Sequence, residues 1–165
     1  MKIKTSYRMF FSACAAIIAL MALAPLQAQA KSCSTAKAAG NWAYTYTGSI
    51  FTANGFLPAA SVGHYTTHAD GTLVGSQARS VAGSSGEEDI AGTVIVNADC
   101  TATATIGVYV NGQLQRTTVL AVVYDDNMNH ARAIFQSVVS PDNTNIPAVI
   151  TSDNTRVFPE APLEK

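Results

Sequence analysis

The sequence predicts an all-β protein, an antiparallel meander of about eight strands closed into a small β-barrel. Runs rich in Val, Ile, Thr and Tyr recur along the chain, and Gly, Asn and Asp reversals separate them. No segment shows helical spacing over three turns, so parallel crossovers are not expected. A barrel removes the exposed edges of antiparallel strands, and a two-sheet β-sandwich is the alternative that periodicity leaves open.

The first thirty residues have the layout of a secretory signal peptide. They contain a basic head (Lys2, Lys4 and Arg8), an apolar run (residues 9–25) and a small-residue cleavage site (Ala28-Gln29-Ala30). We expect cleavage after Ala30 and a secreted or periplasmic protein. The apolar run is short for a bilayer span, which disfavours the alternative of a retained membrane anchor.

Cleavage leaves 135 residues, enough for one domain, which we expect at residues 31–158 with a flexible tail at 159–165. This mature chain has seven basic and eleven acidic residues, a net charge of −4. The charge argues against nucleic acid and anionic membrane surfaces as partners, and we expect no membrane insertion after cleavage. The sequence carries no signal for an oligomeric state.

The elements follow in order from the mature N-terminus. Residues 33–39 can form one helical turn, capped by Ser34 and stopped at Gly40. Strands are expected at 42–49, 60–67, 72–81, 90–96, 101–110, 113–124 and 130–139. Their reversals include Asp70-Gly71, Asn97-Ala98-Asp99-Cys100, Asn111-Gly112 and Asp125-Asp126-Asn127. Residues 82–88 are expected to form a flexible polar loop. The last strand comprises 148–151 and 156–158, with a break at 152–154 left open.

Two cysteines, Cys33 and Cys100, stay in the mature chain, because Cys14 leaves with the signal peptide. Exported proteins meet oxidising conditions, so we predict a Cys33–Cys100 disulfide that ties the start of the mature chain to a hairpin tip. An intermolecular bridge and two free thiols are the alternatives.

Several short motifs carry a resemblance to a known group of proteins. They are Cys33-Ser34, Gly40-Asn41-Trp42-Ala43-Tyr44, Val62-Gly63, Asp70-Gly71 with Gly75, and the stretch from Val94 to Thr103. In these the chain resembles small secreted bacterial β-barrel proteins of unassigned function, which are similar to the allene oxide cyclase barrel, a calycin-like fold shared with plant dirigent proteins. The chain departs from that pattern at Thr67 and His68, where Phe and Asp are commoner. The resemblance implies the fold, and no catalytic motif of the cyclases transfers to this sequence.

Trp42, Tyr44 and Tyr46 fall on one face of the first strand. Aromatic side chains with polar tips often line ligand pockets, so these three are candidate ligand-binding residues. They can equally form the core plug of a narrow barrel.

Four arginines, Arg79, Arg116, Arg132 and Arg156, lie within predicted strands. An arginine in a barrel lumen is costly unless it meets a carboxylate or an anionic ligand. Arg116 and Arg132 each share one face of their own strand with aliphatic residues, and the two strands are neighbours. We therefore predict that the two arginines face the same side and bind ligand. The alternative is an outward arginine whose stem covers apolar surface.

We expect no metal or cofactor. His64 and His68 would stand about 13 Å apart on one strand face, too far to share a metal ion. Glu87, Glu88 and Asp89 lack the ligand spacing of a calcium loop and are expected in a solvated loop. Serine nucleophile motifs, Gly-rich phosphate loops and paired Cys motifs are absent from the sequence.

The favoured function is therefore a non-enzymatic barrel that binds a small apolar or amphipathic molecule or serves as a surface interaction module. The alternative, implied by the resemblance, is an isomerase or cyclase that shapes its substrate in the lumen. A cavity of roughly 300 Å³ with convergent polar groups would favour ligand binding or cyclisation, and a filled lumen would favour a structural role. A buried ionisable group inside that cavity would favour the enzyme.

Overall fold

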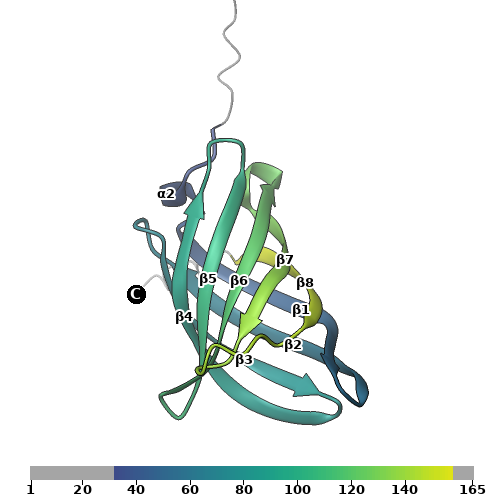
Figure 1. Ribbon diagram of the computed structural model, residues 1–165. Coiled ribbons are helices and arrows are strands. Elements are labelled where there is room, and N and C mark those ends of the chain that lie inside the picture. Colours follow the sequence, from purple (N-terminus) through teal and green to yellow (C-terminus); the bar gives the residue numbers. More distant parts are fainter. Residues whose placement is uncertain (1–31, 158–165) are drawn as a thin grey trace, which may run out of the picture. The chain divides into compact units, whose positions relative to one another are not determined.

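The computed structural model describes residues 32–157, and this part of the chain forms a closed β-barrel. Each strand pairs antiparallel with the next along the chain, and the last pairs with the first (Figure 1). The predicted fold class is confirmed, in the barrel form and not as a sandwich. The predicted signal peptide at 1–30 and the predicted tail at 159–165 lie outside the described residues.

The described elements are a short helix, eight strands and one helical turn. They are α2 (Thr35–Ala38), β1 (Gly40–Thr52), β2 (Gly55–Thr67), β3 (Thr72–Val81), β4 (Ser84–Val96), β5 (Thr101–Val110), β6 (Gln113–Asp125), η1 (Asp126–Met128), β7 (His130–Val139) and β8 (Ala148–Val157). Along each strand, buried and exposed residues alternate, so one face of the sheet lines the lumen and the other faces solvent.

Three regions contain more strand than the sequence predicts. β1 and β2 continue through the expected loop after Ser49 and meet at a short turn before Gly55. β4 begins at Ser84, inside the stretch expected to be a flexible loop, and β8 runs without a break. The reason is pairing: Ser84 to Glu88 are register partners of Val81 to Gln77 on β3. Ladder hydrogen bonds therefore outweigh the turn preference of Gly and Ser.

Arg116 and Arg132 face opposite sides of the sheet, so the prediction that they share a face is wrong. Arg116 is 16% exposed and points into the lumen, whereas Arg132 is 71% exposed on the outer surface. The reversal between β6 and β7 pairs Asp125 with His130, so odd-numbered residues of β6 lie opposite even-numbered residues of β7. Residues directly opposite each other share a face, so the even-numbered Arg116 and Arg132 fall on different faces. A register shift on β7 after Phe135 then moves Val138 to the inner face.

Figure 1 shows α2 at one end of the barrel. Packed side chains close this end. Trp42 is 1% exposed, stacks on Tyr65 at a ring-centroid distance of 6.2 Å, and meets Tyr124 edge-on at 5.7 Å. The Arg156 guanidinium lies 4.8 Å from the centroid of the Trp42 ring. It also donates hydrogen bonds to the backbone carbonyls of Lys37, Ala39 and Met128.

The segment before β1 is tied to this closed end as predicted. Cys33 and Cys100 form a disulfide with their Cα atoms 4.9 Å apart, which joins the start of the described chain to the β4–β5 turn. The Ser34 hydroxyl accepts a hydrogen bond from the Lys37 amide and caps α2, and Gly40 follows the helix with φ +145°. The predicted disulfide, cap and stop are confirmed.

β7 and β8 are joined over only part of their length. Their register partners run from His130 opposite Thr155 to Ile134 opposite Thr151, five pairs in all. Beyond that point the strands separate, as Figure 1 shows, and the 140–147 segment lies between them. This segment is held by hydrogen bonds from the Ile146 amide to the Val138 carbonyl and from the Phe51 amide to the Pro147 carbonyl, both 2.8 Å.

Candidate functional site

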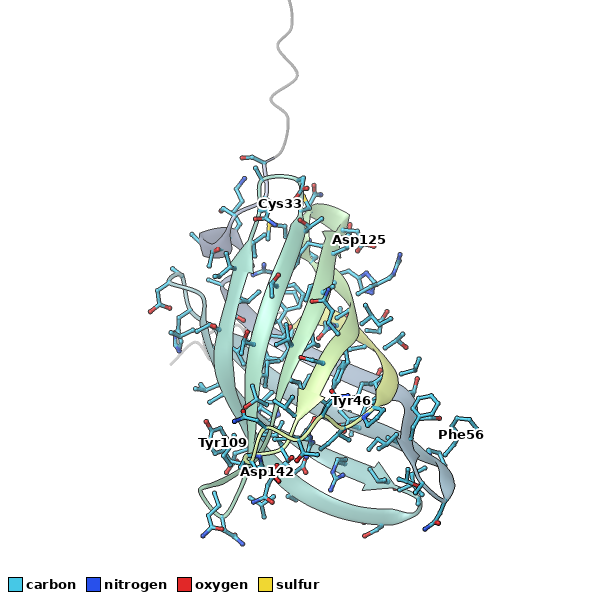
Figure 2. The ribbon with its side chains drawn as sticks, viewed as in Figure 1. Cys33, Tyr46, Phe56, Tyr109, Asp125 and Asp142 are labelled. Carbon is cyan, nitrogen blue, oxygen red and sulfur yellow. A yellow bond between two sulfur atoms is a disulfide. The ribbon has the colours of Figure 1, made fainter. Side chains whose placement is uncertain are left out.

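The barrel interior contains two neighbouring spaces. An inner cavity of about 70 Å³ lies within the lumen, and a mouth pocket of about 280 Å³ lies at the end away from the disulfide. Figure 2 shows Cys33 at one end of the barrel and Tyr46 toward the other. Tyr46, Arg116 and Phe135 line both spaces and form the boundary between them. A molecule passing from the mouth pocket to the inner cavity must move past these three side chains.

Both spaces have mainly apolar walls. The inner cavity is lined by Leu73, Ile90, Ile106, Val108 and Leu120 among others, and the mouth pocket by Ile50, Val110, Val138, Ile146 and Ile150 among others. Ligand pockets in proteins are commonly built this way, with a few polar groups set into apolar surroundings.

The polar groups form a hydrogen-bonded network centred on Glu88, whose side chain is 3% exposed. Arg116 binds this carboxylate at two points, with Nη1 2.8 Å from Oε1 and Nη2 2.6 Å from Oε2. Gln77 Nε2 also donates to Oε2, at 2.6 Å. The side-chain oxygen of Gln77, Oε1, in turn accepts hydrogen bonds from the hydroxyls of Tyr44, at 2.7 Å, and Ser61, at 3.0 Å. Five strands therefore contribute to one connected network.

Strand register brings the members of the network together. Gln77 pairs with Glu88 across β3 and β4, and with Gly63 across β2 and β3, while Gly63 pairs with Tyr44 across β1 and β2. Gly63 leaves space for the two side chains beside it. A Cβ atom at this position would lie 2.8 Å from the Tyr44 ring and 2.9 Å from Gln77 Cβ. The Tyr44–Gln77 hydrogen bond thus depends on a glycine between its partners.

Arg79 adds a second cation next to the Glu88 carboxylate. Its Nε lies 2.9 Å from Glu88 Oε1, which is an ion-pair distance, but the contact does not have the geometry of a hydrogen bond. Among the described residues, this buried N–H has no hydrogen-bond partner. The Arg79 side chain is 32% exposed and lines the mouth pocket. It is therefore the more accessible of the two arginines in the network.

The electrostatics of the network keep Glu88 ionised. Burial alone would raise the pKa of Glu88, but the hydrogen bonds and positive charge of Arg116, with smaller contributions from Gln77 and Arg79, hold that pKa below its usual value. Burial also raises the pKa of Tyr44 and Tyr46 above the ordinary value, so their hydroxyls stay protonated at neutral pH. The site therefore offers cations and neutral hydroxyl groups to a ligand.

A third space opens sideways where β7 and β8 separate. This lateral pocket of about 360 Å³ shares Phe135, Val138, Ile146 and Ala148 with the mouth pocket. Phe135 lines all three spaces, and its ring packs edge-on against Tyr46 at a centroid distance of 5.5 Å. The position of Phe135 thus governs how the three spaces communicate.

The structure brings together three of the five predicted ligand-binding residues. Tyr44, Tyr46 and Arg116 line the inner cavity. Trp42 lies in the core of the closed end, as the alternative of a core plug expected. Arg132 lies outside the barrel, where its Nη2 is 3.1 Å from an Asp125 carboxylate oxygen.

Sequence reasoning did not identify four members of the network as site residues, namely Ser61, Gln77, Arg79 and Glu88. The expectation that Glu88 lies in a solvated loop is wrong, because β4 extends past it and turns it inward. A signal for this was present: Glu88 stands two residues before Ile90 and so shares its strand face. Glu87 and Asp89, by contrast, are exposed on the outer face.

No protein-family model matches the chain, and no curated protein matches it. The structure agrees with the resemblance to the allene oxide cyclase barrel at the level of a small eight-stranded β-barrel. Within residues 32–157 no helix has the length and apolar character needed to cross a bilayer. The same residues contain no group of three His, Cys, Asp or Glu side chains arranged to hold a metal ion.

Proposed function

We propose that the barrel binds one small amphipathic molecule, with an apolar part in the lumen and a polar part at the network around Glu88. The observation that carries this proposal is the apolar mouth pocket of about 280 Å³, which adjoins an inner cavity across Tyr46, Arg116 and Phe135. Ligand pockets start at about 300 Å³, so the two spaces together suit a compact ligand. A barrel acting only as a surface interaction module would need neither the pocket nor the buried network.

An isomerase or cyclase is the second candidate, because Glu88 is a buried ionisable group beside the lumen. A catalytic carboxylate usually has a pKa shifted toward the operating pH. The pKa of Glu88 is instead lowered, and both its oxygens already accept hydrogen bonds. This arrangement supports binding better than proton transfer.

Export remains part of the proposal. A disulfide is typical of oxidising compartments, and the Cys33–Cys100 bridge supports the predicted secreted or periplasmic location. The intact mass of the exported protein tests it. We expect a mature chain that starts at Lys31, and a membrane-bound species that keeps residues 1–30 would contradict the prediction.

Ligand binding can be tested with N-phenyl-1-naphthylamine, a neutral dye that fluoresces in apolar surroundings. We expect saturable binding of one dye molecule to the disulfide-bonded protein. Ala148→Trp places an indole in the mouth pocket and should weaken binding by about tenfold or more. The matched control is Val149→Trp, because Val149 is the neighbouring residue of β8 and points outward.

Equal dye binding by the two tryptophan variants would show that the dye sits on the outer surface and would contradict the proposal. So would a folded wild-type barrel that binds no dye.

A further inference from the structure

We propose that the ligand of the barrel carries a single negatively charged group, which lies at the mouth against Arg79 while the apolar part of the ligand points toward the inner cavity. This inference rests on the proposed function and names the chemical class of its ligand. Three observations lead to it: the charge balance of the network, the unpartnered N–H of Arg79, and the apolar walls around both.

The charge balance at the mouth is unequal. Among the described residues, the charged side chains that line the mouth pocket are Arg79, Arg116 and Glu88, two cations against one anion. Arg116 and Glu88 satisfy each other through a two-point ion pair. Arg79 shares the same carboxylate at 2.9 Å, so the three side chains together keep a net charge of +1. A buried or half-buried charge is stabilised by an opposite charge, which a ligand can supply.

Arg79 is the group that would meet such a ligand. Its Nε–H is buried and has no hydrogen-bond partner among the described residues, although Glu88 Oε1 lies 2.9 Å from the nitrogen. An unpartnered buried donor is costly, and an anionic oxygen bound in its direction would remove that cost. About a third of the Arg79 side chain is exposed at the mouth pocket, so a ligand can reach it without unfolding the barrel.

The walls of the mouth pocket exclude a small free anion as the best ligand. Ile50, Val110, Phe135, Val138 and Ile146 surround the arginines and would leave inorganic phosphate with few partners. An anion attached to an apolar body satisfies both parts of the pocket, because the body removes these side chains from water while the anion meets Arg79.

Two dyes that differ by one group provide the test. N-phenyl-1-naphthylamine is neutral, and 1-anilinonaphthalene-8-sulfonate has the same rings with an added sulfonate. Wild-type protein should bind the sulfonate dye about tenfold more tightly than the neutral one. Arg79→Gln should abolish that preference, so that the ratio of the two dye affinities falls from about tenfold to about one. Arg79→Lys, which keeps the charge, should retain part of it.

The matched control is Arg132→Gln, which removes one positive charge from the outer surface and changes the net charge equally. It should preserve the preference, which separates a local contact from long-range attraction. Sodium decanoate should displace the sulfonate dye at lower concentration than decanol, and inorganic phosphate should not displace it at similar concentrations.

The outcomes separate this inference from the proposed function. Binding of both dyes with equal affinity by wild-type protein would overturn the anionic ligand and leave the binding barrel intact. Displacement by phosphate as effective as by decanoate would overturn the amphipathic part. Absence of binding of either dye would overturn the proposed function itself. The wild-type comparison decides the question even if Arg79→Gln fails to fold.

Discussion

Arg116 and Glu88 form a two-point ion pair inside the barrel, although they come from β6 and β4, which are not adjacent in the sheet. The pair spans the inner face of β5 and joins strands that share no ladder hydrogen bonds. Its Arg116 lies at the boundary between the mouth pocket and the inner cavity, so the pair both stabilises the barrel and forms part of the candidate site.

Glu88→Gln should destabilise the barrel by about 3 kcal/mol, because breaking a buried ion pair leaves uncompensated charge, here on Arg116 and Arg79. Urea unfolding followed by circular dichroism measures the change. Glu87→Gln is the control, since Glu87 is exposed on the neighbouring position of β4 and should change stability by about 0.5 kcal/mol or less. Equal effects of the two substitutions would mean that the ion pair contributes nothing.

Gly63→Ala should cost about 1–3 kcal/mol and break the Tyr44–Gln77 hydrogen bond. The added Cβ would lie 2.5 Å from the Ser76 carbonyl oxygen, and that backbone atom belongs to a paired strand and cannot move freely. Gly86→Ala on β4 is the control, because a Cβ there meets nothing within 4 Å. Thermal unfolding of the two variants makes the comparison, and a Gly63 variant as stable as the wild type would contradict this account of the site.

His130 should make the barrel less stable as the pH rises through neutrality. Its ring nitrogens lie 2.6 Å from an Asp125 oxygen and 3.0 Å from an Asp153 oxygen, and these hydrogen bonds raise its pKa above the ordinary value of 6.5. A raised pKa means that the folded state binds the proton more tightly. This stabilisation is complete below the unfolded pKa and is lost as the pH passes the folded pKa.

Melting temperatures of the wild type measured between pH 5.5 and 8.5 should therefore fall across this range, and His130→Gln should lose that component of the fall. His64→Gln is the control, since His64 is exposed on the outer face of β2. An unchanged pH profile in the His130 variant would contradict the prediction. Titration of the His130 ring protons by NMR provides a direct measurement of the pKa.

Removal of the disulfide by the double substitution of Cys33 and Cys100 with Ser should lower the free energy of unfolding by up to about 4 kcal/mol in the chain-entropy model. The bridge closes a loop of 67 residues in the unfolded chain. The hydrogen bond from the Val96 amide to the Thr35 hydroxyl, at 3.0 Å, should open first, and hydrogen exchange at this amide would report it. Unchanged stability and unchanged protection of Val96 would show that the bridge is dispensable.

The strands and most turns follow from the sequence because local alternation and turn residues determine them. The inward stripe of Trp42, Tyr44 and Tyr46 is an example. The face of the sheet on which Arg132 lies depends instead on the number of residues in the β6–β7 reversal. In this reversal Asp126, Asn127 and Met128 all have positive φ. Propensity does not specify such a turn. The same holds for Glu88, whose neighbours suit a loop until β3 pairs with them.

The junctions between adjacent strands of this barrel, here called seams, differ in the number of residue pairs that join them. Five residue pairs join β7 to β8, whereas the other adjacent strands in the described chain share eight or more. Local opening requires least free energy where fewest backbone hydrogen bonds break, so thermal fluctuation should widen this seam long before the barrel unfolds. We therefore expect the lumen to open intermittently between β7 and β8, and a molecule broader than the mouth to enter there, past Phe135.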